Sequence, residues 1–144
     1  MDLFRAHVLV CGGTGCSSSG SAELIKRFEE QIAKNGLDKE VKVVRTGCFG
    51  LCEAGPVVIV YPEGTFYSRI RPDDVDEIVS EHLLKGRIVQ RLLHKEGDAA
   101  EKVTSLSDTQ FYKKQLRIAL RNCGVINPEN IDAVSYTHLT LPTI

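Results

Sequence analysis

Two glycine-rich loops that carry cysteines place the strongest constraint on how this chain can fold. The loops hold two cysteine pairs separated by 31 residues, Cys11 with Cys16 and Cys48 with Cys52. Each loop follows a short apolar run rich in β-branched residues, at residues 6–10 and 41–45, and each run predicts a buried strand. If these two strands run parallel in one sheet, they end at the same edge, and the four thiols converge there.

The rest of the pattern over residues 6–85 combines strands and helices. Apolar residues recur at helical spacing after the first loop, and Ser19 or Ser21 is the expected N-cap of that helix. Pro72 and Gly86 frame a second helix. The predicted strands cover residues 6–10, 41–45, 57–61 and 65–70, and the predicted helices cover roughly 21–35 and 72–85. This β-α-β-β-β-α order predicts a two-layer α/β domain with a right-handed crossover between its first two strands.

The periodic pattern of apolar residues becomes weaker after that domain. Residues 96–110 are rich in small and polar residues and are typical of a linker. Ser107 and Gln110 have the spacing of a capping box, which predicts a further helix over residues 108–123. The apolar face of that helix consists of Leu116, Ala119, Leu120 and Cys123. This face has no evident partner within the chain, so we expect it to open another domain, with Cys123 acting as a small hydrophobic residue.

Composition argues against several classes of protein. The chain of 144 residues, 42% of them hydrophobic, is long enough for one domain with an appendage. Its 18 Lys and Arg against 19 Asp and Glu give a formal net charge of -1, which argues against a nucleic-acid partner. It contains no apolar run long enough for direct membrane insertion. Five cysteines without a secretory signal indicate a reducing, cytoplasmic compartment, where thiols more often bind metal than form disulfides.

Four converging thiolates repel one another unless a cation neutralises them. Iron with bridging sulfide does so, and four cysteines are the usual ligands of a [2Fe–2S] cluster. Glycines let backbone N–H groups approach the sulfurs of such a cluster, and those in the two loops include Gly12, Gly13, Gly15 and Gly50. The helix after Ser19 would direct its positive N-terminus towards the anionic cluster, whereas Glu53 beside the second pair would disfavour reduction.

Two other kinds of site are compatible with the same cysteines. Structural zinc tolerates two to four residues between paired ligands, so a zinc-stabilised interaction module is one alternative, although a domain of this size does not need a metal to fold. A thiol–disulfide oxidoreductase is the other, although the redox dithiol expected near a βαβ pattern is C-x-x-C, which this chain lacks. A third possibility, that the cysteines are core residues buried only for packing, is disfavoured because glycine-rich loops are poor places to bury a thiol.

The run Cys-Phe-Gly-Leu-Cys-Glu-Ala-Gly-Pro at residues 48–56, with the C-x4-C pair before it, resembles the thioredoxin-like [2Fe–2S] ferredoxin family. More narrowly, residues 1–95 are similar to the amino-terminal ferredoxin domain of a larger protein. That protein is the NADH-oxidising flavoprotein component of NAD(P)-linked iron hydrogenases and of complex-I-like NADH dehydrogenases. Residues 111–129 are similar to the start of its flavin-binding domain. Gly55-Pro56 occupies the place where thioredoxin-like folds keep a cis-proline.

The resemblance implies a thioredoxin-like α/β fold with a helical C-terminal extension. It also implies one-electron transfer alongside the other subunits of an NADH-linked redox complex. The cluster ligands carry over onto Cys11, Cys16, Cys48 and Cys52 alone. The FMN, NAD(H) and [4Fe–4S] sites of such a flavoprotein are expected only in a C-terminal part beyond this chain, so we do not expect the chain to oxidise NADH by itself.

The expected division of the chain follows from the same resemblance. The predicted parts are a ferredoxin domain at residues 1–95, a linker at 96–110, the start of a truncated flavin-binding domain at 111–132 and a tail at 133–144. The tail contains no Asp, Glu, Lys or Arg and resembles a translated sequencing adapter, so we set it aside from fold reasoning.

Overall fold

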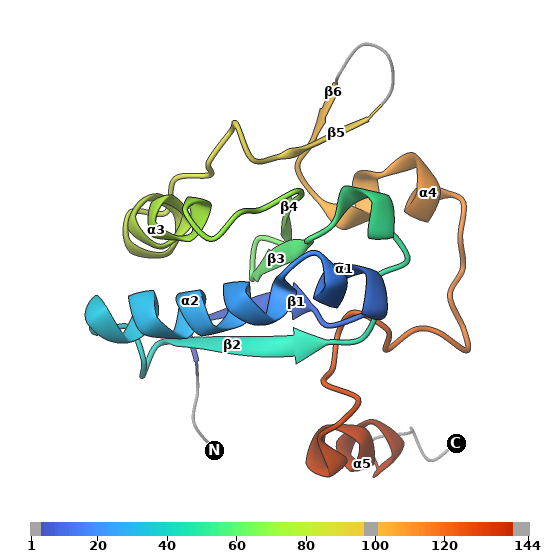
Figure 1. The fold of residues 1–144 in the computed structure, drawn as a ribbon. Helices are drawn as coiled ribbons and strands as arrows, with labels where there is room; N and C mark the ends of the chain where they lie inside the picture. The colour runs from blue at the N-terminus through green and yellow to red at the C-terminus, as the bar shows by residue number, and fades with distance from the viewer. Residues whose placement is uncertain (1–3, 97–100, 140–144) are drawn as a thin grey trace.

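A four-stranded sheet forms the centre of the computed structural model, which describes residues 4–96 and 101–139 (Figure 1). The strands are β1 (Ala6–Cys11), β2 (Val41–Thr46), β3 (Val58–Tyr61) and β4 (Thr65–Tyr67), and their order in the sheet is β2-β1-β3-β4. β1 runs parallel to β2, with Cys11 opposite Thr46. β3 is antiparallel to both β1 and β4. The predicted parallel pair and the α/β class are therefore confirmed.

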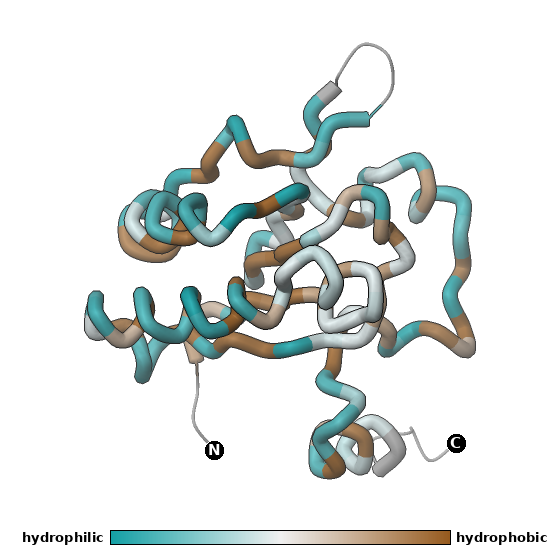
Figure 2. The backbone as a smooth tube through the Cα atoms, in the orientation of Figure 1, coloured by the Kyte–Doolittle hydropathy of each residue, from teal (hydrophilic) through white to brown (hydrophobic). Residues whose placement is uncertain are grey.

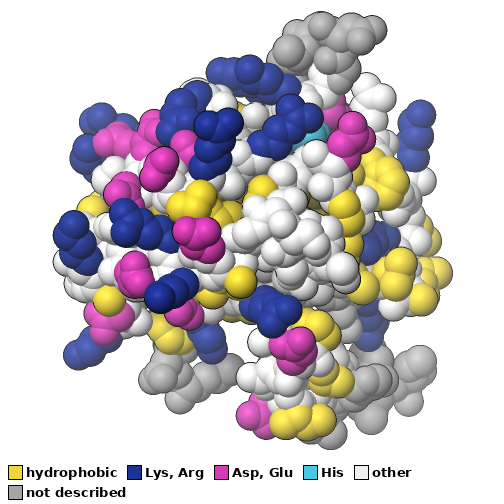
Figure 3. Space-filling view, in the orientation of Figure 1, with side chains coloured by type: hydrophobic (Ala, Val, Ile, Leu, Met, Phe, Trp, Pro, Cys, Tyr) yellow, Lys and Arg dark blue, Asp and Glu magenta, His cyan; other side chains and the backbone are white. Residues whose placement is uncertain are grey.

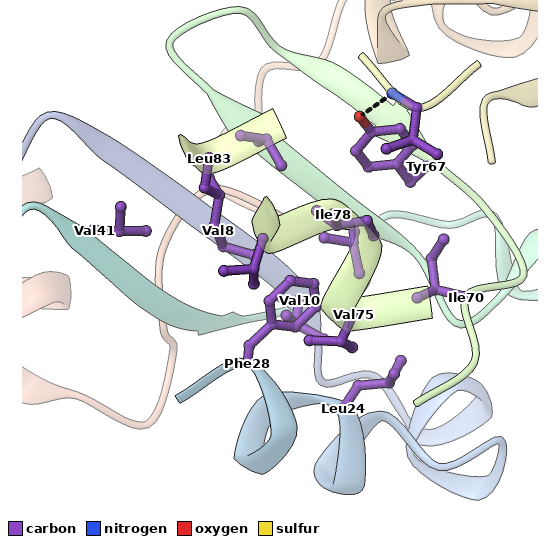
Figure 4. Close-up of a cluster of buried hydrophobic side chains, with 14 of the residues drawn as sticks. Val8, Val10, Leu24, Phe28, Val41, Tyr67, Ile70, Val75, Ile78 and Leu83 are labelled. Carbon is purple, nitrogen blue, oxygen red and sulfur yellow. Dashed lines mark hydrogen bonds between the residues drawn. The ribbon is translucent and has the colours of Figure 1, made fainter. Parts of the chain in front are cut away.

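Two helical elements pack on one face of this sheet. The first is α2 (Ser21–Lys34), and the second begins as α3 (Asp74–Glu77) and continues as the π-helix η2 (Ile78–Leu84). Alternation along β1 explains why they pack there, because every second side chain of a strand points to the same face. The side chains that meet between β1 and the helices include Val8, Val10, Leu24, Phe28, Val75 and Ile78, all fully buried (Figure 4).

A second buried cluster uses the other alternate residues of β1. Leu9 and Cys11 pack with Phe49, Phe66 and neighbouring apolar side chains. Cys16 belongs to this same cluster, so the floor of the cysteine loops is apolar. Figure 2 shows the corresponding pattern along the backbone, with hydrophobic segments in the strands and polar ones on the outer turns of the helices.

The first loop is more regular than predicted. It contains a short helix, α1 (Thr14–Ser18), where an irregular loop was expected. The hydroxyls of Ser18 and Ser19 donate to the carbonyls of Thr14 and Gly15, each 3.0 Å away. These serines therefore complete the turn of α1, and neither Ser19 nor Ser21 caps α2. Gly20 takes the N-cap position instead, with a φ of +91° that suits glycine.

The region around residues 94–113 also differs from prediction. Two strands, β5 (His94–Glu96) and β6 (Glu101–Val103), form a second sheet within and beside the predicted linker. The short helix η3 (Leu106–Asp108) follows, and then α4 (Gln110–Lys113). Ser107 does not cap α4. Thr109 does, because its hydroxyl accepts a hydrogen bond from the Tyr112 N–H at 3.3 Å.

The long helix predicted over residues 108–123 is wrong beyond Lys113. Leu116 is 87% exposed and Leu120 is 57% exposed, so most of the face that should have stabilised this helix is open to solvent. A helix without such packing is marginal in water. A further helix, α5 (Ile131–Leu139), begins where the Asn130 side chain accepts hydrogen bonds from the N–H groups of Asp132 and Ala133. It covers the start of the predicted tail, and residues 140–144 of that tail lie outside the described residues.

Two further local features bear on the site. β4 ends at Tyr67 rather than at residue 70, because Arg69 adopts a positive φ of 53° that interrupts an extended strand. The Gly55–Pro56 and Tyr61–Pro62 peptide bonds are cis, the first as the resemblance implied. Among the described helices, none combines the length and the apolar character needed to cross a membrane.

Candidate metal centre

The four cysteines of the two loops meet at one edge of the sheet. Cys11 is the last residue of β1, and Cys48 follows the end of β2 by two residues. Cys16 lies within α1, and Cys52 begins the short helix η1 (Cys52–Ala54). Because Cys11 is paired with Thr46 in the parallel register, both loops leave the sheet at the same edge. The convergence predicted from the strand pattern is therefore present.

The thiols are grouped as two contacting pairs. The sulfurs of Cys48 and Cys52 lie 3.8 Å apart, and the Cys16 thiol is hydrogen-bonded to that of Cys11. The Cys52 thiol also interacts electrostatically with Cys11 and so links the pairs. Across the described residues, no three His, Cys, Asp or Glu side chains surround a common point in the way that a single metal ion needs. Cys123, which sequence reasoning kept apart, belongs to neither pair.

Burial divides the site into an inner and an outer half. Cys11 and Cys16 are 2% and 1% exposed, whereas Cys48 and Cys52 are exposed. Burial, together with the neighbouring Cys11 thiol, raises the pKa of Cys16 to about 12. The pKa of Cys52 is also raised, chiefly by its hydrogen bond and charge interaction with Cys48. The raised pKa values of Cys16 and Cys52 favour the protonated thiols, and compensating positive charge would favour the thiolates.

The donor set fits a cluster of two irons. Four cysteine thiolates are the usual ligands of a [2Fe–2S] cluster, and each iron takes two of them. Two pairs of thiols, one buried and one exposed, match that requirement. A structural zinc would instead need all four sulfurs around one ion at about 2.3 Å.

Glycines allow the two loops to approach the thiols closely. A Cβ on Gly13 would lie 3.0 Å from the Cβ of Cys48, and a Cβ on Gly15 would lie 3.2 Å from that of Cys52. The Gly50 N–H donates to the Cys48 sulfur at 3.2 Å, and its φ of +85° favours glycine. These three predicted glycines therefore lie beside the thiols.

Gly12 has a different neighbourhood from the other predicted glycines. A Cβ there would lie 2.9 Å from the Thr46 carbonyl oxygen and would also meet the Arg45 side chain, so this glycine allows the loop to pack against β2. The short helix α1, with Cys16 inside it, lies between Cys11 and the start of α2 along the chain. That the N-terminus of α2 is directed towards the cluster stays a prediction.

Gly55 is a close neighbour of the thiols that sequence reasoning missed. A Cβ on Gly55 would lie only 2.8 Å from the Cys16 sulfur and 3.1 Å from the Cys52 carbonyl oxygen. The position was visible in the sequence only as the residue before Pro56. Its contact with Cys16 joins two separate loops, and no local pattern reports such a contact.

A C-terminal stretch, residues 109–129, covers the Cys48 loop, and we call it the cover segment. The Tyr112 hydroxyl donates to the Phe49 carbonyl, and the Gly47 N–H donates to the Ile126 carbonyl at 3.3 Å. Gly124, with a φ of +82°, packs directly against the Phe49 ring, so closely that a side chain there would overlap it. The cover segment therefore holds the loop on which the outer thiols lie. No periodicity in the sequence indicated this role.

Charge also ties the cover segment to β2. Arg45 forms an ion pair with Glu129 at 3.2 Å, close to the point where β2 leads into the Cys48 loop. Both side chains are largely exposed, so the pair contributes little, about 0–1 kcal/mol. Its effect is to orient the end of the cover segment rather than to anchor it.

Comparison with known proteins places this arrangement in a family. The family model of thioredoxin-like [2Fe-2S] ferredoxins matches residues 3–83. A 2Fe-2S ferredoxin of Clostridium pasteurianum is 47% identical over 96 residues, covering 61% of this chain and 94% of that protein. A putative 2Fe-2S ferredoxin of Priestia megaterium is 30% identical over 130 residues, covering 90% of this chain and 84% of that protein.

The solved structures agree with the sequence comparison. The crystal structure of the wild-type thioredoxin-like [2Fe-2S] ferredoxin from Aquifex aeolicus has a TM-score of 0.59 and 38% sequence identity, over 65% of this chain and 100% of that one. The fold, the cysteine pairs and the extent of these matches lead to one assignment. This chain belongs to the thioredoxin-like [2Fe–2S] ferredoxin family, whose function is electron transfer through a [2Fe–2S] cluster.

Proposed function

We propose that Cys11, Cys16, Cys48 and Cys52 are the four ligands of the [2Fe–2S] cluster, and that the chain accepts and donates single electrons through it. The observation that carries this proposal is the convergence of the four thiols, as two contacting pairs, at one edge of the sheet. The cluster supplies the reversible uptake of one electron. The protein supplies the ligands, the surrounding dipoles and the exclusion of water.

The residues around the thiols divide these tasks. Burial of Cys11 and Cys16 excludes water from the inner half of the site. The Gly50 N–H, which donates to the Cys48 sulfur, stabilises negative charge on that thiolate. The exposed Cys48 and Cys52 mark the side on which an electron enters or leaves. Glu53, exposed next to Cys52, disfavours added negative charge and therefore lowers the reduction potential.

We further propose that the electrons pass to or from an NADH-linked, multisubunit oxidoreductase, as in the hydrogenases and NADH dehydrogenases named above. The similarity of residues 111–129 to the start of a flavin-binding domain supports this assignment. The exposed apolar side chains of Leu116, Ile118 and Leu120 support it too, because such a stretch suits contact with another protein. The extensive coverage of the C. pasteurianum and P. megaterium ferredoxins favours a chain that acts as a separate carrier rather than as a fragment of the flavoprotein.

Metal analysis of matched variants tests the ligand assignment. The protein is produced and purified without oxygen, and iron, zinc and acid-labile sulfide are measured beside the visible spectrum. We expect equal iron and sulfide, a paramagnetic resonance signal on one-electron reduction and a negative reduction potential. Each of Cys11→Ser, Cys16→Ser, Cys48→Ser and Cys52→Ser should abolish or distort the spectrum, whereas Cys123→Ser should preserve it.

The other outcomes identify the alternatives. Zinc without iron would indicate a zinc-stabilised module, and metal-free protein with a reversible disulfide between Cys48 and Cys52 would indicate a thiol–disulfide oxidoreductase. A Cys123→Ser variant that loses the spectrum while Cys16→Ser keeps it would overturn the ligand set.

A further inference from the structure

A groove rich in basic residues lies beside the exposed half of the cysteine site. It has a volume of about 320 Å³ and is formed between the end of β4 and the segment that leads to β5. The charged and titratable side chains in its lining are Arg69, Arg71, Asp74, Arg91, His94 and Lys95. Figure 3 shows Lys and Arg side chains on the part of the surface where Figure 1 places the stretch from α3 to β5, with Asp and Glu side chains among them on the α3 side.

Asp74, the acidic residue in the lining of the groove, is already paired with a positive charge. Asp74 is 8% exposed, and it accepts hydrogen bonds from the Arg91 guanidinium at 2.7 Å and from the Arg71 N–H at 2.9 Å. Arg91 also pairs with Glu77. In the described part of the chain, no ion pair engages Arg69, Arg71 or Lys95, and all three residues are exposed. The groove therefore presents uncompensated positive charge to solvent.

The groove adjoins the cysteine site. A second hollow, of about 400 Å³, shares Arg69, His94 and Lys95 with the groove and is also lined by Cys52. Its acidic residues are Glu53 and Glu96, and the Glu96 carboxylate accepts a hydrogen bond from the Gln110 N–H at 2.9 Å. Arg71 and Arg91 line the groove alone, whereas Arg69 and Lys95 line both hollows and connect the groove to the side of Cys52.

Arg69 is held in place by its backbone. Its φ of 53° is uncommon for a residue other than glycine, and such conformations concentrate at functional positions. The Arg69 N–H donates to the Ala54 carbonyl at 2.9 Å, in the turn that contains Cys52. This hydrogen bond fixes the backbone of Arg69 to the turn that contains Cys52.

We infer that this groove docks a redox partner protein through an acidic surface rich in Asp and Glu carboxylates, so that electrons cross at the Cys52 side. The inference rests on the proposed function and names the kind of partner that it requires. Positive charge next to the site of electron exchange attracts an oppositely charged partner and orients it before contact. The exposed Cys52 then faces that partner directly.

Charged oxidants test the inference without knowledge of the partner. The cluster-loaded protein is reduced with dithionite, excess reductant is removed, and oxidation by anionic ferricyanide or by cationic hexaamminecobalt(III) is followed by stopped-flow absorbance. We expect Arg69→Glu/Lys95→Glu to slow the reaction with ferricyanide about tenfold and to accelerate the reaction with the cobalt complex. Lys26→Glu/Lys34→Glu, with the same charge change on α2, should alter both rates less than about twofold. The differences should shrink as salt is added.

A polymer of carboxylates tests for an acidic protein surface rather than a free anion. Poly-L-glutamate should slow ferricyanide oxidation of the unmodified protein but not of Arg69→Glu/Lys95→Glu, and inorganic phosphate at equal ionic strength should have no such effect. Inhibition by phosphate instead would overturn the docking assignment in favour of a small-anion site.

Iron content and the visible spectrum of each variant separate the two proposals. A loaded Arg69→Glu/Lys95→Glu variant with unchanged rates would overturn the groove and leave the cluster assignment intact. If Arg69→Glu prevents cluster loading, Lys95→Glu alone provides the test, because Lys95 is exposed and lies in β5, away from the Cys52 turn. Unmodified protein that contains no iron would overturn the proposed function itself.

Discussion

The hydroxyl of Tyr112 donates a hydrogen bond to the carbonyl of Phe49, which lies 63 residues earlier in the chain and directly after Cys48. Arg117 donates in turn to the same hydroxyl at 2.8 Å, so the tyrosine oxygen both gives and receives a bond. The backbone beside an outer cysteine is thereby fixed by a residue from a distant part of the chain. The stability of the Cys48 loop depends on the cover segment as well as on the sheet.

The first prediction concerns this bond. Tyr112→Phe removes the donor to the Phe49 carbonyl, a loss of about 1 kcal/mol, so the loop should open more often. We expect iron to be lost to a chelator roughly fivefold faster, measured as decay of visible absorbance. Tyr61→Phe, which removes a hydroxyl from a residue that is 40% exposed, is the control and should change nothing. Equal rates in all three proteins would show that the bond does not hold the loop.

The second prediction concerns Gly55. Gly55→Ala would place a methyl group 2.8 Å from the Cys16 sulfur, so this thiol or its turn must shift. We expect less iron per chain and an altered spectrum, because the positions of the ligands control cluster binding. Gly47→Ala is the matched control, since its nearest neighbours lie 3.9 Å away and its φ is ordinary. Full loading of Gly55→Ala would mean that the Cys16 turn moves freely.

The third prediction concerns pH. The Tyr67 hydroxyl lies 2.8 Å from His82 Nδ1 and accepts a hydrogen bond from the Val89 N–H at 3.1 Å, so it donates its own proton to a neutral histidine. Burial lowers the pKa of His82, and the nearby Glu63 opposes this shift. The unfolded chain, whose histidine titrates near pH 6.5, therefore takes up the proton first as pH falls, and the free energy of unfolding decreases.

Thermal unfolding of the loaded protein checks this third prediction. We expect the unfolding midpoint, followed by circular dichroism, to decrease as the pH is lowered through about 6.5. His82→Asn retains an acceptor near the Nδ1 position but cannot titrate, so its midpoint should depend less on pH. Some dependence should persist, because burial also lowers the pKa of His94. Parallel pH curves for the two proteins would exclude His82 as a source of the effect.

The fourth prediction is that loaded protein does not oxidise NADH. A hydride carries two electrons, whereas an iron–sulfur cluster accepts one, so a flavin must separate them. With NADH and a one-electron acceptor, absorbance should stay constant until a flavoprotein that oxidises NADH is added. Turnover by the chain alone would show that a hydride-accepting site has been overlooked.

Sequence patterns predicted the parts of the fold that follow from a periodic run of residues or from a fixed spacing. Strand pairing of β1 with β2 followed from two β-branched runs, and the meeting of the four cysteines followed from that pairing. The N-caps were missed because several serines and threonines were available at each helix start. The Ser18 and Ser19 hydroxyls donate to carbonyls of α1, which leaves Gly20 as the N-cap of α2, and the Thr109 hydroxyl accepts from the first turn of α4. The long helix predicted after residue 108 was wrong because most of its apolar stripe is open to solvent.

The features of the site that were missed all join distant segments. Gly55 meets Cys16 across two loops, and Gly124 meets Phe49 from the other end of the chain. Such contacts have no period and no spacing, because each depends on how two loops are placed in space. The basic groove is similar, since Arg69 and Lys95 come from separate elements. Only the folded arrangement brings them beside Cys52.

The position of the cover segment has a consequence for biogenesis. During synthesis all four cysteines, the last of them at residue 52, leave the ribosome before Tyr112 and Gly124 do. The thiols are therefore complete as a set while the Cys48 loop is still open, and chain order leaves an interval in which scaffold or carrier proteins can reach them. Contact of Tyr112 and Gly124 with Phe49 then fixes the Cys48 loop, although Cys48 and Cys52 remain exposed, so the order of synthesis separates completion of the thiol set from support of its outer half.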